Sequence, residues 1–560
     1  MKKVMFLKYL TIFVCLTTIA CQQKVSKEKP VKQPNILLIV ADDMGFSDIE
    51  PFGGNISTPI LTQLSKESSL FSNFHVLPTC SPSRSVMLTG NDNHVAGLGI
   101  MGEADYPVLQ NQNLPGYAGY LSNQVATIPE LLRNNGYHTY MTGKWHLGEG
   151  PGRDPYDRGF EQTFILSTGG GSHWSDKKAL APPQHMSYTR NGKEVEPPQD
   201  FYSSRNYTDS MIQFIKINKA DEKPFFAFLS YTAVHDPLHA PKEYIEKYKG
   251  KFDMGWDSLY MQRLKNLQAL GIVPQSLNRF AKNPTVPQWN KLDQHHKEEY
   301  ARDMEVYAAM LDYMDMSIGR VFEYLKKEGM YDNTMIIFTS DNGANGQMAS
   351  FYPGNEDGKY LGSFENEMEN RGSKNSYIEM GPGWAQAVSA PFKFFKTFTT
   401  EGGIKSPLVI KMPGKNAGGK WNNSLLHVSD LMPTILELTN TAYPLEFNGN
   451  KIHALIGNSI MPILTEQAGE VTRTNGIGYE LFEMKAFIKG KWKILRLPKP
   501  MGTGNWQLFD LNTDPGETTD LSEQYPEIKA ELINGWNEYA KTNEVYNHNG
   551  HFDSIYQRSF

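Results

Sequence analysis

The stretch NILLIVADD, residues 35–43, decides the fold expected for this 560-residue chain. After Asn35 the run is apolar up to Ala41, as in a strand that is buried on both faces of a parallel sheet. It ends directly in two acids, Asp42 and Asp43. When such strands alternate with helices along a chain, they predict an α/β protein.

Three later apolar runs end in polar side chains in the same way. The runs and the residues that follow them are 138–141 with Lys144 and His146, 223–231 with His235, and 334–339 with Asp341 and Asn342. A short helix over 127–136 and a long amphipathic helix over 304–325 are expected between them. Because parallel α/β sheets bind ligands at the carboxyl ends of their strands, we expect these side chains to converge.

The acids and the amide of this set offer only oxygen ligands. Asp42, Asp43, Asp341 and Asn342 therefore suit a hard divalent cation such as calcium or magnesium, and not zinc. One acidic pair alone would more simply be a helix cap or a turn. Two such sites in one chain favour the metal interpretation.

The basic residues of the set are expected to surround whatever anion the metal holds. Lys144, His146 and His235 are interpreted as cationic or proton-transferring groups. Taken singly, Lys144 is more simply a solvated charge, and each histidine is more simply a hydrogen-bonded structural residue.

A lone thiol lies in the stretch TCSPSRSVMLTG, residues 79–90. Pro82 suits the first turn of a helix that continues through Leu88. The amides of that turn and the guanidinium of Arg84 would favour an oxyanion. Cys80 itself fits poorly as a nucleophile, because neighbouring carboxylates raise the pKa of a thiol.

The first 21 residues, MKKVMFLKYLTIFVCLTTIAC, have the lysines and the apolar run of a secretory signal. Their end resembles a lipoprotein cleavage site with Cys21 as the lipid-bearing residue; a plain signal peptide cut nearby is the alternative. Residues 22–33 are interpreted as a polar tether. We therefore expect an exported bacterial protein, periplasmic or at the cell surface. With Cys15 removed and Cys21 lipidated, Cys80 remains alone and no internal disulfide is possible.

Composition argues against nucleic acid as a partner and against a membrane-spanning segment after the N-terminal signal. The net charge of −6 and the scattered basic residues argue against nucleic acid. No second apolar run is long enough to span a bilayer, so membrane attachment is expected only through the N-terminal lipid.

Six motifs together resemble the type I sulfatases. They are Asp42-Asp43, Cys80-Ser81-Pro82-Ser83-Arg84 followed by Leu88-Thr89-Gly90, Gly143-Lys144-Trp145-His146, His235 with Pro237, Asp341-Asn342-Gly343, and Glu401-Gly402-Gly403. The likeness runs from about Pro34 to the C-terminal region and is greatest to bacterial arylsulfatases of the Pseudomonas type. In this family a maturation enzyme oxidises the cysteine to Cα-formylglycine.

The resemblance implies a role for each residue of the set. It makes Ca²⁺ the cofactor, with ligands from Asp42, Asp43, Asp341, Asn342 and the modified Cys80. The catalytic roles that it implies are Arg84 orienting the formylglycine hydrate, Lys144 and Lys396 binding sulfate oxygens, His235 protonating the leaving alcohol, and His146 assisting the second step.

The mechanism that the resemblance implies explains why the thiol is replaced. One hydroxyl of the hydrated aldehyde attacks sulfur and displaces the alcohol or phenol. The remaining hydroxyl then loses its proton, and the hemiacetal ester collapses to aldehyde and sulfate.

The resemblance also implies the architecture. An alkaline-phosphatase-like domain over 34–465 is expected, with a large mixed sheet flanked by helices. Residues 466–560 are expected to form a smaller α+β subdomain, with a hairpin over 485–497, a strand over 505–511 and a helix over 526–541.

The sequence leaves the substrate class open among several kinds of ester. An aryl sulfate is the first expectation, and a sulfated saccharide is the alternative, for which the lipid anchor speaks. A loop over 169–174, His239 and Trp384 are candidates for the alcohol side of the pocket. A phosphonate or phosphate ester hydrolase is a further alternative. A non-catalytic lipoprotein that binds sulfated glycans would be expected to have lost Cys80 or a metal ligand, and none is lost.

Overall fold

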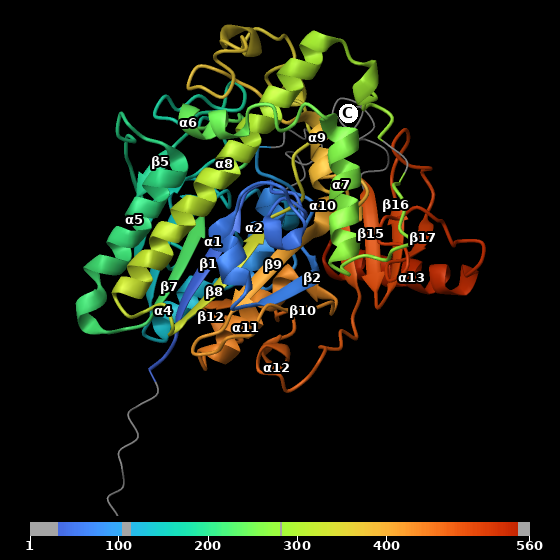
Figure 1. Ribbon diagram of the computed structural model, residues 1–560. Helices are drawn as coiled ribbons and strands as arrows, with labels where there is room; N and C mark the ends of the chain where they lie inside the picture. Colours follow the sequence, from blue (N-terminus) through green and yellow to red (C-terminus); the bar gives the residue numbers. More distant parts are fainter. Residues whose placement is uncertain (1–31, 104–113, 281–282, 547–560) are drawn as a thin grey trace, which may run out of the picture. The chain divides into compact units, whose positions relative to one another are not determined.

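The central strand of the fold is the one that the sequence places first. The computed structural model describes residues 32–103, 114–280 and 283–546 (Figure 1). In it β1 (Asn35–Ala41) lies between β8 (Thr334–Ser340) and β7 (Phe225–Ser230), and both run parallel to it. Val40 pairs with Ser230 on one side and with Thr339 on the other, so the three strands end at the same level.

These strands belong to an 11-stranded mixed sheet with the order β10-β2-β9-β8-β1-β7-β3-β4-β5-β6 and β11 beside β2. The other strands are β2 (Ser69–His75), β3 (His138–Lys144), β4 (Gln162–Leu166), β5 (Tyr188–Arg190), β6 (Lys193–Glu194), β9 (Lys405–Lys411), β10 (Lys420–Asn422) and β11 (Leu426–His427). The block from β8 to β4 is parallel, whereas β9 is antiparallel to β8 and β2. The expected large mixed sheet is thus confirmed.

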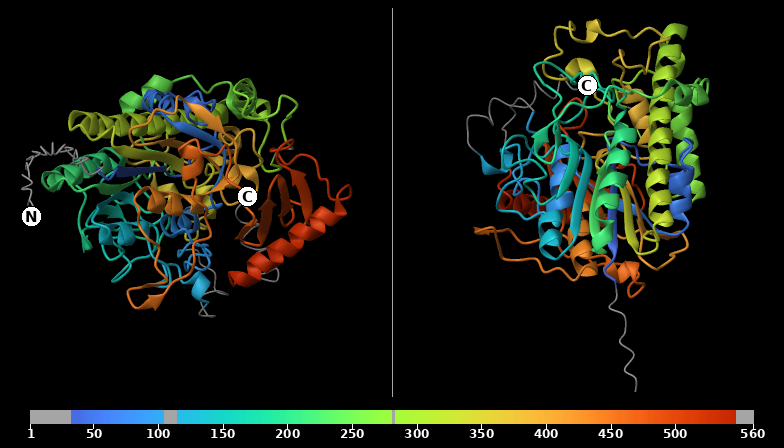
Figure 2. Two further views of the ribbon diagram at one scale, coloured as in Figure 1. Left: turned by 90° about the horizontal axis from the view of Figure 1, so that it is seen from below. Right: turned by 90° about the vertical axis from the view of Figure 1, so that its left-hand side faces the viewer.

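Helices pack on both faces of the sheet (Figures 1 and 2). One group is α1 (Pro59–Ser65), α5 (Ser203–Ile217) and α8 (Gln294–Lys327), and the other is α2 (Cys80–Thr89), α4 (Ile128–Asn134) and α11 (Leu431–Leu438). The other elements are α6 (Lys242–Ile245), α7 (Gly255–Ala269), α9 (Gly381–Val388), α10 (Glu401–Ile404), α12 (Met461–Leu464) and the strand pair β12 (Glu446–Phe447) and β13 (Asn450–Lys451). Within the described ranges, no helix combines the length and apolar character that crossing a bilayer requires.

The long helix α8 is confirmed but begins earlier than the sequence predicts. The apolar periodicity starts at Met304, whereas the helix starts at Gln294. Asp293 caps it by accepting a hydrogen bond from the His296 amide at 2.9 Å. The first turns carry charged and exposed side chains, so no hydrophobic period marks them.

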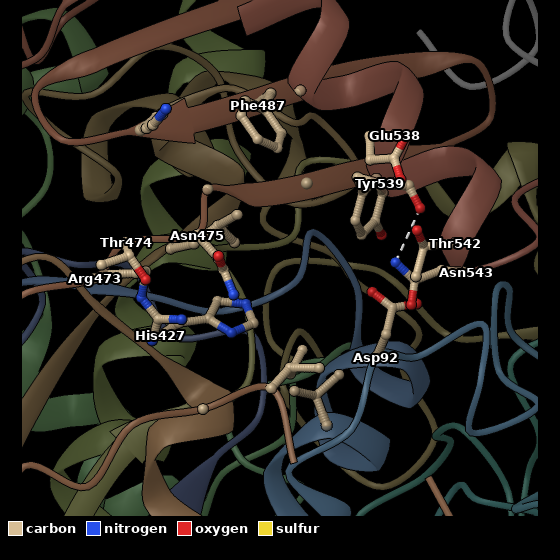
Figure 3. A pocket seen from close by; sticks show the side chains of 18 of the residues that line it. Asp92, His427, Arg473, Thr474, Asn475, Phe487, Glu538, Tyr539, Thr542 and Asn543 are labelled. Atoms are coloured by element: carbon tan, nitrogen blue, oxygen red, sulfur yellow. Dashed lines mark hydrogen bonds between the residues drawn. The ribbon is translucent and has the colours of Figure 1, made fainter. Parts of the chain in front are cut away.

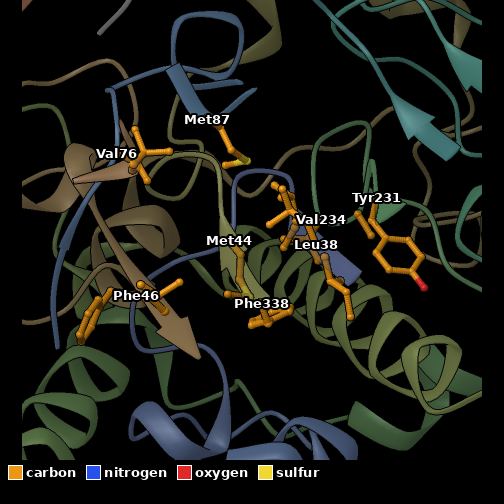
Figure 4. Close-up of a cluster of buried hydrophobic side chains, with 14 of the residues drawn as sticks. Leu38, Met44, Phe46, Val76, Met87, Tyr231, Val234 and Phe338 are labelled. Carbon is orange, nitrogen blue, oxygen red and sulfur yellow. The ribbon is translucent and has the colours of Figure 1, made fainter. Parts of the chain in front are cut away.

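A rigid apolar layer supports the strand ends. Leu38 of β1 and Phe338 of β8 have no exposed surface, and Met87 of α2 and Tyr231 after β7 are equally buried (Figure 4). Because protein interiors are close-packed, side chains that follow these strands are held in fixed positions.

The C-terminal region forms a separate antiparallel sheet, seen in red in Figure 1. Its strands are β14 (Ile477–Leu481), β15 (Met484–Lys489), β16 (Trp492–Arg496) and β17 (Gln507–Asp510), paired in that order, and α13 (Pro526–Thr542) packs on it. The hairpin at Gly490, the following strand and the last helix are confirmed. β14 was not expected from its sequence, IGYEL, in which a glycine and a glutamate interrupt the apolar pattern. The boundary near residue 466 stays a prediction.

A buried ion cluster joins the two sheets. Glu401 accepts from Lys493 of β16 at 2.9 Å and faces His75 of β2 at 2.9 Å, and Lys493 also pairs with Glu517 at 2.8 Å. Burial raises the pKa of Glu401, but Lys493 and His75 outweigh burial and hold this pKa well below its usual range. The Glu401-Gly402-Gly403 motif is therefore tied to the small sheet.

Removing the shared cation of this cluster will destabilise the protein. Lys493→Met leaves Glu401 and Glu517 buried without it, and we expect the free energy of unfolding in urea to fall by about 3 kcal/mol or more. Lys489→Met is the matched control, because Lys489 pairs with Glu531 at the surface and such pairs contribute ~1 kcal/mol or less. Equal, small losses in the two variants would show that the cluster does not hold the sheets together.

Candidate active site

The predicted oxygen donors meet at the ends of β1 and β8. The Asp43 amide donates to Asp341 Oδ1 at 3.2 Å, and Asn342 Nδ2 donates to Asp43 Oδ1 at 2.6 Å. Asp42 lies beside them and, like Asp341 and Asn342, has no exposed surface. Three carboxylates are thus buried within one small volume.

Three cations compensate these carboxylates one by one. Lys144 Nζ lies 2.9 Å from Asp42 Oδ2, and Lys396 Nζ lies 2.8 Å from Asp43 Oδ2. Arg84 contacts Asp341 Oδ2 with Nε at 2.8 Å and with Nη2 at 2.7 Å. The formal charges of the six groups sum to zero, so a divalent cation added here leaves the site positive.

A close approach between the backbones of β3 and β7 positions Lys144. Gly143 has a φ of 100°, and a Cβ on it would lie 1.6 Å from the Ser230 carbonyl oxygen of β7. Glycine at this position lets β3 lie against β7, so Lys144 at the end of β3 reaches Asp42.

The Glu401-Gly402-Gly403 motif places Lys396. A Cβ on Gly343 would lie 2.0 Å from the Gly402 carbonyl oxygen, and the Gly343 amide donates to Gly403 at 3.0 Å. The Lys396 amide donates to the Ala344 carbonyl at 2.9 Å. The loop that carries Lys396 is therefore fixed to the residues that directly follow Asn342.

Cys80 is the first residue of α2, and its free thiol is buried against the carboxylates. Sγ lies 3.8 Å from Asp43 Oδ1. Burial, which Lys144 and Lys396 only partly offset, raises the pKa of the Cys80 thiol to about 12. The side chain therefore stays protonated at neutral pH and is not an activated cysteine nucleophile.

Arg84 is held from several sides on the next turn of α2. Besides its contact with Asp341, its Nη1 donates to the Lys144 carbonyl at 3.0 Å and to the hydroxyl of Ser230. Ser230 in turn donates to the Lys144 carbonyl at 2.8 Å. Ser230 was not singled out from the sequence, although its place at the end of β7 is a usable signal.

His235 adjoins Asp43 and Lys396. Its Nδ1 donates to the Asp236 carbonyl at 2.6 Å, and since a carbonyl only accepts, Nδ1 carries a proton. Its Nε2 lies 3.3 Å from Asp43 Oδ2 and 3.4 Å from Lys396 Nζ. Nε2 therefore faces the centre of the site.

His146 lies beside the cluster but contacts a residue that the sequence did not indicate. Its Nε2 is 2.6 Å from Glu103 Oε1, and its carbonyl accepts from Ser81 Oγ at 2.8 Å. Burial lowers the pKa of His146. Among the residues that the structure describes, its buried Nδ1 has no hydrogen-bond partner. No strand end or motif marks Glu103.

The donor set fits a hard divalent cation. Asn342 Oδ1 is a buried carbonyl oxygen with no hydrogen-bond partner in the described part of the chain, which is costly unless a cation or water binds it. The ligand atoms of Asp42, Cys80 and Asp341 lie within 4.8 Å of one another, as do those of Asp43, Cys80 and His235. Carboxylate and amide oxygens of this kind suit calcium or magnesium.

The candidates for the alcohol side of the pocket are mostly structural. Trp384 has no exposed surface and packs among Trp256 and Trp289. His239 accepts from the His173 amide at 3.3 Å, and His173 Nε2 lies 3.0 Å from the His235 carbonyl. His173 therefore supports the backbone of His235, and His239 supports that of His173.

Sequence comparison agrees with this arrangement. The sulfatase family matches residues 34–441, and the C-terminal family of N-sulphoglucosamine sulphohydrolase matches residues 392–542. An uncharacterized sulfatase of Schizosaccharomyces pombe is 40% identical over 93% of this chain and 96% of its own length. An arylsulfatase of Klebsiella aerogenes is 39% identical over 72% of this chain and 86% of its own length.

Solved structures share the fold. The crystal structure of Ps i-CgsB in complex with k-i-k-neocarrahexaose has a TM-score of 0.65 at 23% identity and covers 94% of this chain and 97% of that one. The phosphonate monoester hydrolase of Agrobacterium radiobacter has a TM-score of 0.54 at 16% identity, over 91% of this chain and 96% of that one.

The family model matches most of the chain, and two relatives are 40% and 39% identical to it. These matches agree with the site, in which two lysines and an arginine compensate the carboxylates around a buried cysteine. The chain belongs to the type I sulfatase family and is a sulfuric ester hydrolase.

Proposed function

We propose that the protein hydrolyses aryl sulfates by means of a Cα-formylglycine made from Cys80. The observation that carries the proposal is the buried cysteine at the start of α2, which does not ionise and yet lies among Asp43, Lys144 and Lys396. A thiol has no evident use there, whereas the hydrate of an aldehyde at this position supplies an oxygen nucleophile for sulfur.

The metal of this proposal is calcium. Asp42, Asp43, Asp341 and Asn342 would hold it, together with an oxygen on the modified Cys80. The cation would offset the charge of the sulfate group. The unpartnered Asn342 oxygen and the all-oxygen donor set support this assignment.

Lys144 and Lys396 are assigned to bind the sulfate oxygens. Both ammonium groups lie at the edge of the carboxylate cluster, on Asp42 and Asp43 respectively. A sulfate monoester carries one negative charge, so the net positive site formed with a divalent cation attracts it. Arg84, held by Asp341, orients the first turn of α2 and the nucleophile on it.

His235 and His146 are assigned to the two proton transfers. When the bond between sulfur and the ester oxygen breaks, that oxygen takes the Nε2 proton of a doubly protonated His235, which keeps the Nδ1 proton that it donates to the Asp236 carbonyl. His146 serves the later, sulfate-releasing step, in which a hydroxyl must lose a proton. Its neutral ring, with a buried Nδ1 that has no partner among the described residues, is suited to accept it.

The aryl assignment is supported by the similarity to the Klebsiella arylsulfatase. A sulfated saccharide is the second candidate, and the likeness of fold to a protein crystallised with neocarrahexaose favours it. Both candidates use the same catalytic residues, so the leaving group is the only difference between them.

We further propose that the protein is exported and lipid-anchored through Cys21, and that a maturation enzyme modifies Cys80. The signal over 1–21 lies outside the described residues, as does almost all of the tether over 22–33. The lysines and the apolar run of the signal support export.

Replacing the nucleophile will abolish turnover. For Cys80→Ala we expect kcat/KM with 4-nitrophenyl sulfate to fall about 10⁴-fold or more, the scale seen when a nucleophile is removed. Ser85→Ala is the matched control on α2, because its hydroxyl only donates to the Pro82 carbonyl. Wild-type enzyme should also prefer 4-nitrophenyl sulfate to 4-nitrophenyl phosphate. Retained activity in Cys80→Ala would overturn the mechanism. A preference for 4-nitrophenyl phosphate would overturn the sulfatase assignment. A higher kcat/KM for galactose 6-sulfate than for 4-nitrophenyl sulfate would replace the aryl assignment with a saccharide one.

Calcium will stabilise the folded chain. Addition of calcium to chelator-treated protein should raise the melting temperature, since at 100-fold excess over Kd a ligand adds about 2.7 kcal/mol. Asn342→Leu should reduce this shift, whereas Asn423→Leu, at an exposed position, should keep it. A shift that is the same in Asn342→Leu would remove Asn342 from the ligand set.

A further inference from the structure

A cavity lies away from the catalytic residues. Its volume is about 600 Å³, within the range of small-molecule sites. Val86 of α2, the segment 455–458, β14 and α13 line it, and none of the residues assigned to catalysis or to the metal does (Figure 3). Most of its lining lies between residues 473 and 543.

One end of the cavity carries hydrogen-bond donors without acceptors. His427 Nδ1 accepts from the Ser429 amide at 3.4 Å, so in the neutral ring Nε2 carries the proton. Burial and the neighbouring Arg473 hold the pKa of His427 well below its usual range. Over the described ranges of the chain, neither His427 Nε2 nor Arg473 Nε has a hydrogen-bond partner, although both are buried. His427 is 3% exposed.

The other end carries acceptors. Figure 3 shows Asp92 and Glu538 across the cavity from His427. Asn93 also lines the cavity, is 2% exposed, and its Oδ1 has no partner in the part of the chain that the structure describes. A ligand that satisfies the whole cavity must therefore accept hydrogen bonds at one end and donate them at the other.

Most of the charges around the cavity are already compensated. Arg473 pairs with Asp430, Lys489 with Glu531 at 2.8 Å, and Asp92 with His94 at 2.9 Å. An ionic ligand is therefore not required. Hydroxyl groups both donate and accept, and the rings of Phe487 and Tyr539 offer apolar surface for the carbon skeleton of a ligand (Figure 3).

We propose that this cavity binds a neutral saccharide, at a site separate from the catalytic centre. A sugar ring presents hydroxyls around an apolar skeleton. Its hydroxyls can accept hydrogen bonds at one end of the cavity and donate them at the other, and its carbon atoms can contact the two aromatic rings. The proposal does not depend on the sulfatase mechanism, because no residue is shared between the two sites.

The test measures binding of three neutral tetrasaccharides to the full chain by isothermal titration calorimetry. The probes are cellotetraose, mannotetraose and a chemically desulfated carrageenan tetrasaccharide. We expect saturable binding of at least one of them that inorganic sulfate does not displace. The proposal is overturned if none of the probes binds when it is present at millimolar concentration and at 10-fold excess over the protein. It is also overturned if inorganic sulfate displaces the bound probe.

A pair of matched variants places the binding. Asn475 lines the cavity and is exposed, so Asn475→Trp fills space without removing a buried contact. Thr472→Trp makes the same change three residues earlier at an exposed position outside the lining. We expect Asn475→Trp to weaken binding roughly tenfold or more, equivalent to 1.4 kcal/mol, and Thr472→Trp to leave it unchanged. Equal affinity in the two variants, each with wild-type turnover of 4-nitrophenyl sulfate to show correct folding, would place the saccharide elsewhere and overturn the assignment.

Discussion

The burial of three carboxylates at the ends of two adjacent parallel strands is the constraint on which the rest of the structure depends. Asp42, Asp43 and Asp341 cannot share one buried volume as anions unless cations are brought to them. Arg84, Lys144 and Lys396 come from three different parts of the chain to do so. The start of α2, the end of β3 and the loop before Glu401 are positioned by this requirement.

Charge compensation also explains why the cysteine is inert and yet placed at the centre. A thiol next to Asp43, without exposure, keeps its proton. A neutral hydrated aldehyde in the same place would not have to ionise before a metal and two lysines assist it. The same environment that disfavours a thiolate therefore suits an oxygen nucleophile.

The sequence predicts those parts of the site that follow buried strands. Asp42, Asp341 and Asn342 could be found because continuous apolar runs end directly before them. Lys396 was indicated only by family resemblance, since no local pattern reports the close contact between Gly343 and Gly402. Glu103 lies in a segment without periodicity and was missed.

Two segments whose sequences mix polar and apolar residues were not predicted, namely the first turns of α8 and the strand β14. The first turns of α8 carry charged residues and form because Asp293 caps them. β14 contains two polar or small residues in five and is held by pairing with β15 along its length. A local cap decides the start of α8 and strand pairing decides β14, and the apolar period reports neither.

The buried ion cluster at Glu401 connects these observations to the C-terminal sheet. Lys493 contacts Glu401, whose neighbouring glycines abut Gly343 next to Asn342. The small sheet thereby supports the loop that carries Lys396. β14 and β15 of this sheet also line the proposed saccharide site, so the sheet contributes both to the catalytic centre and to that site.

The most direct test of the central claim is the mass of the proteolytic peptide that spans Cys80, taken from protein expressed in a host with a formylglycine-generating enzyme. The account predicts an aldehyde in place of the thiol in the active fraction. An unmodified cysteine in protein that turns over a sulfate ester would contradict it.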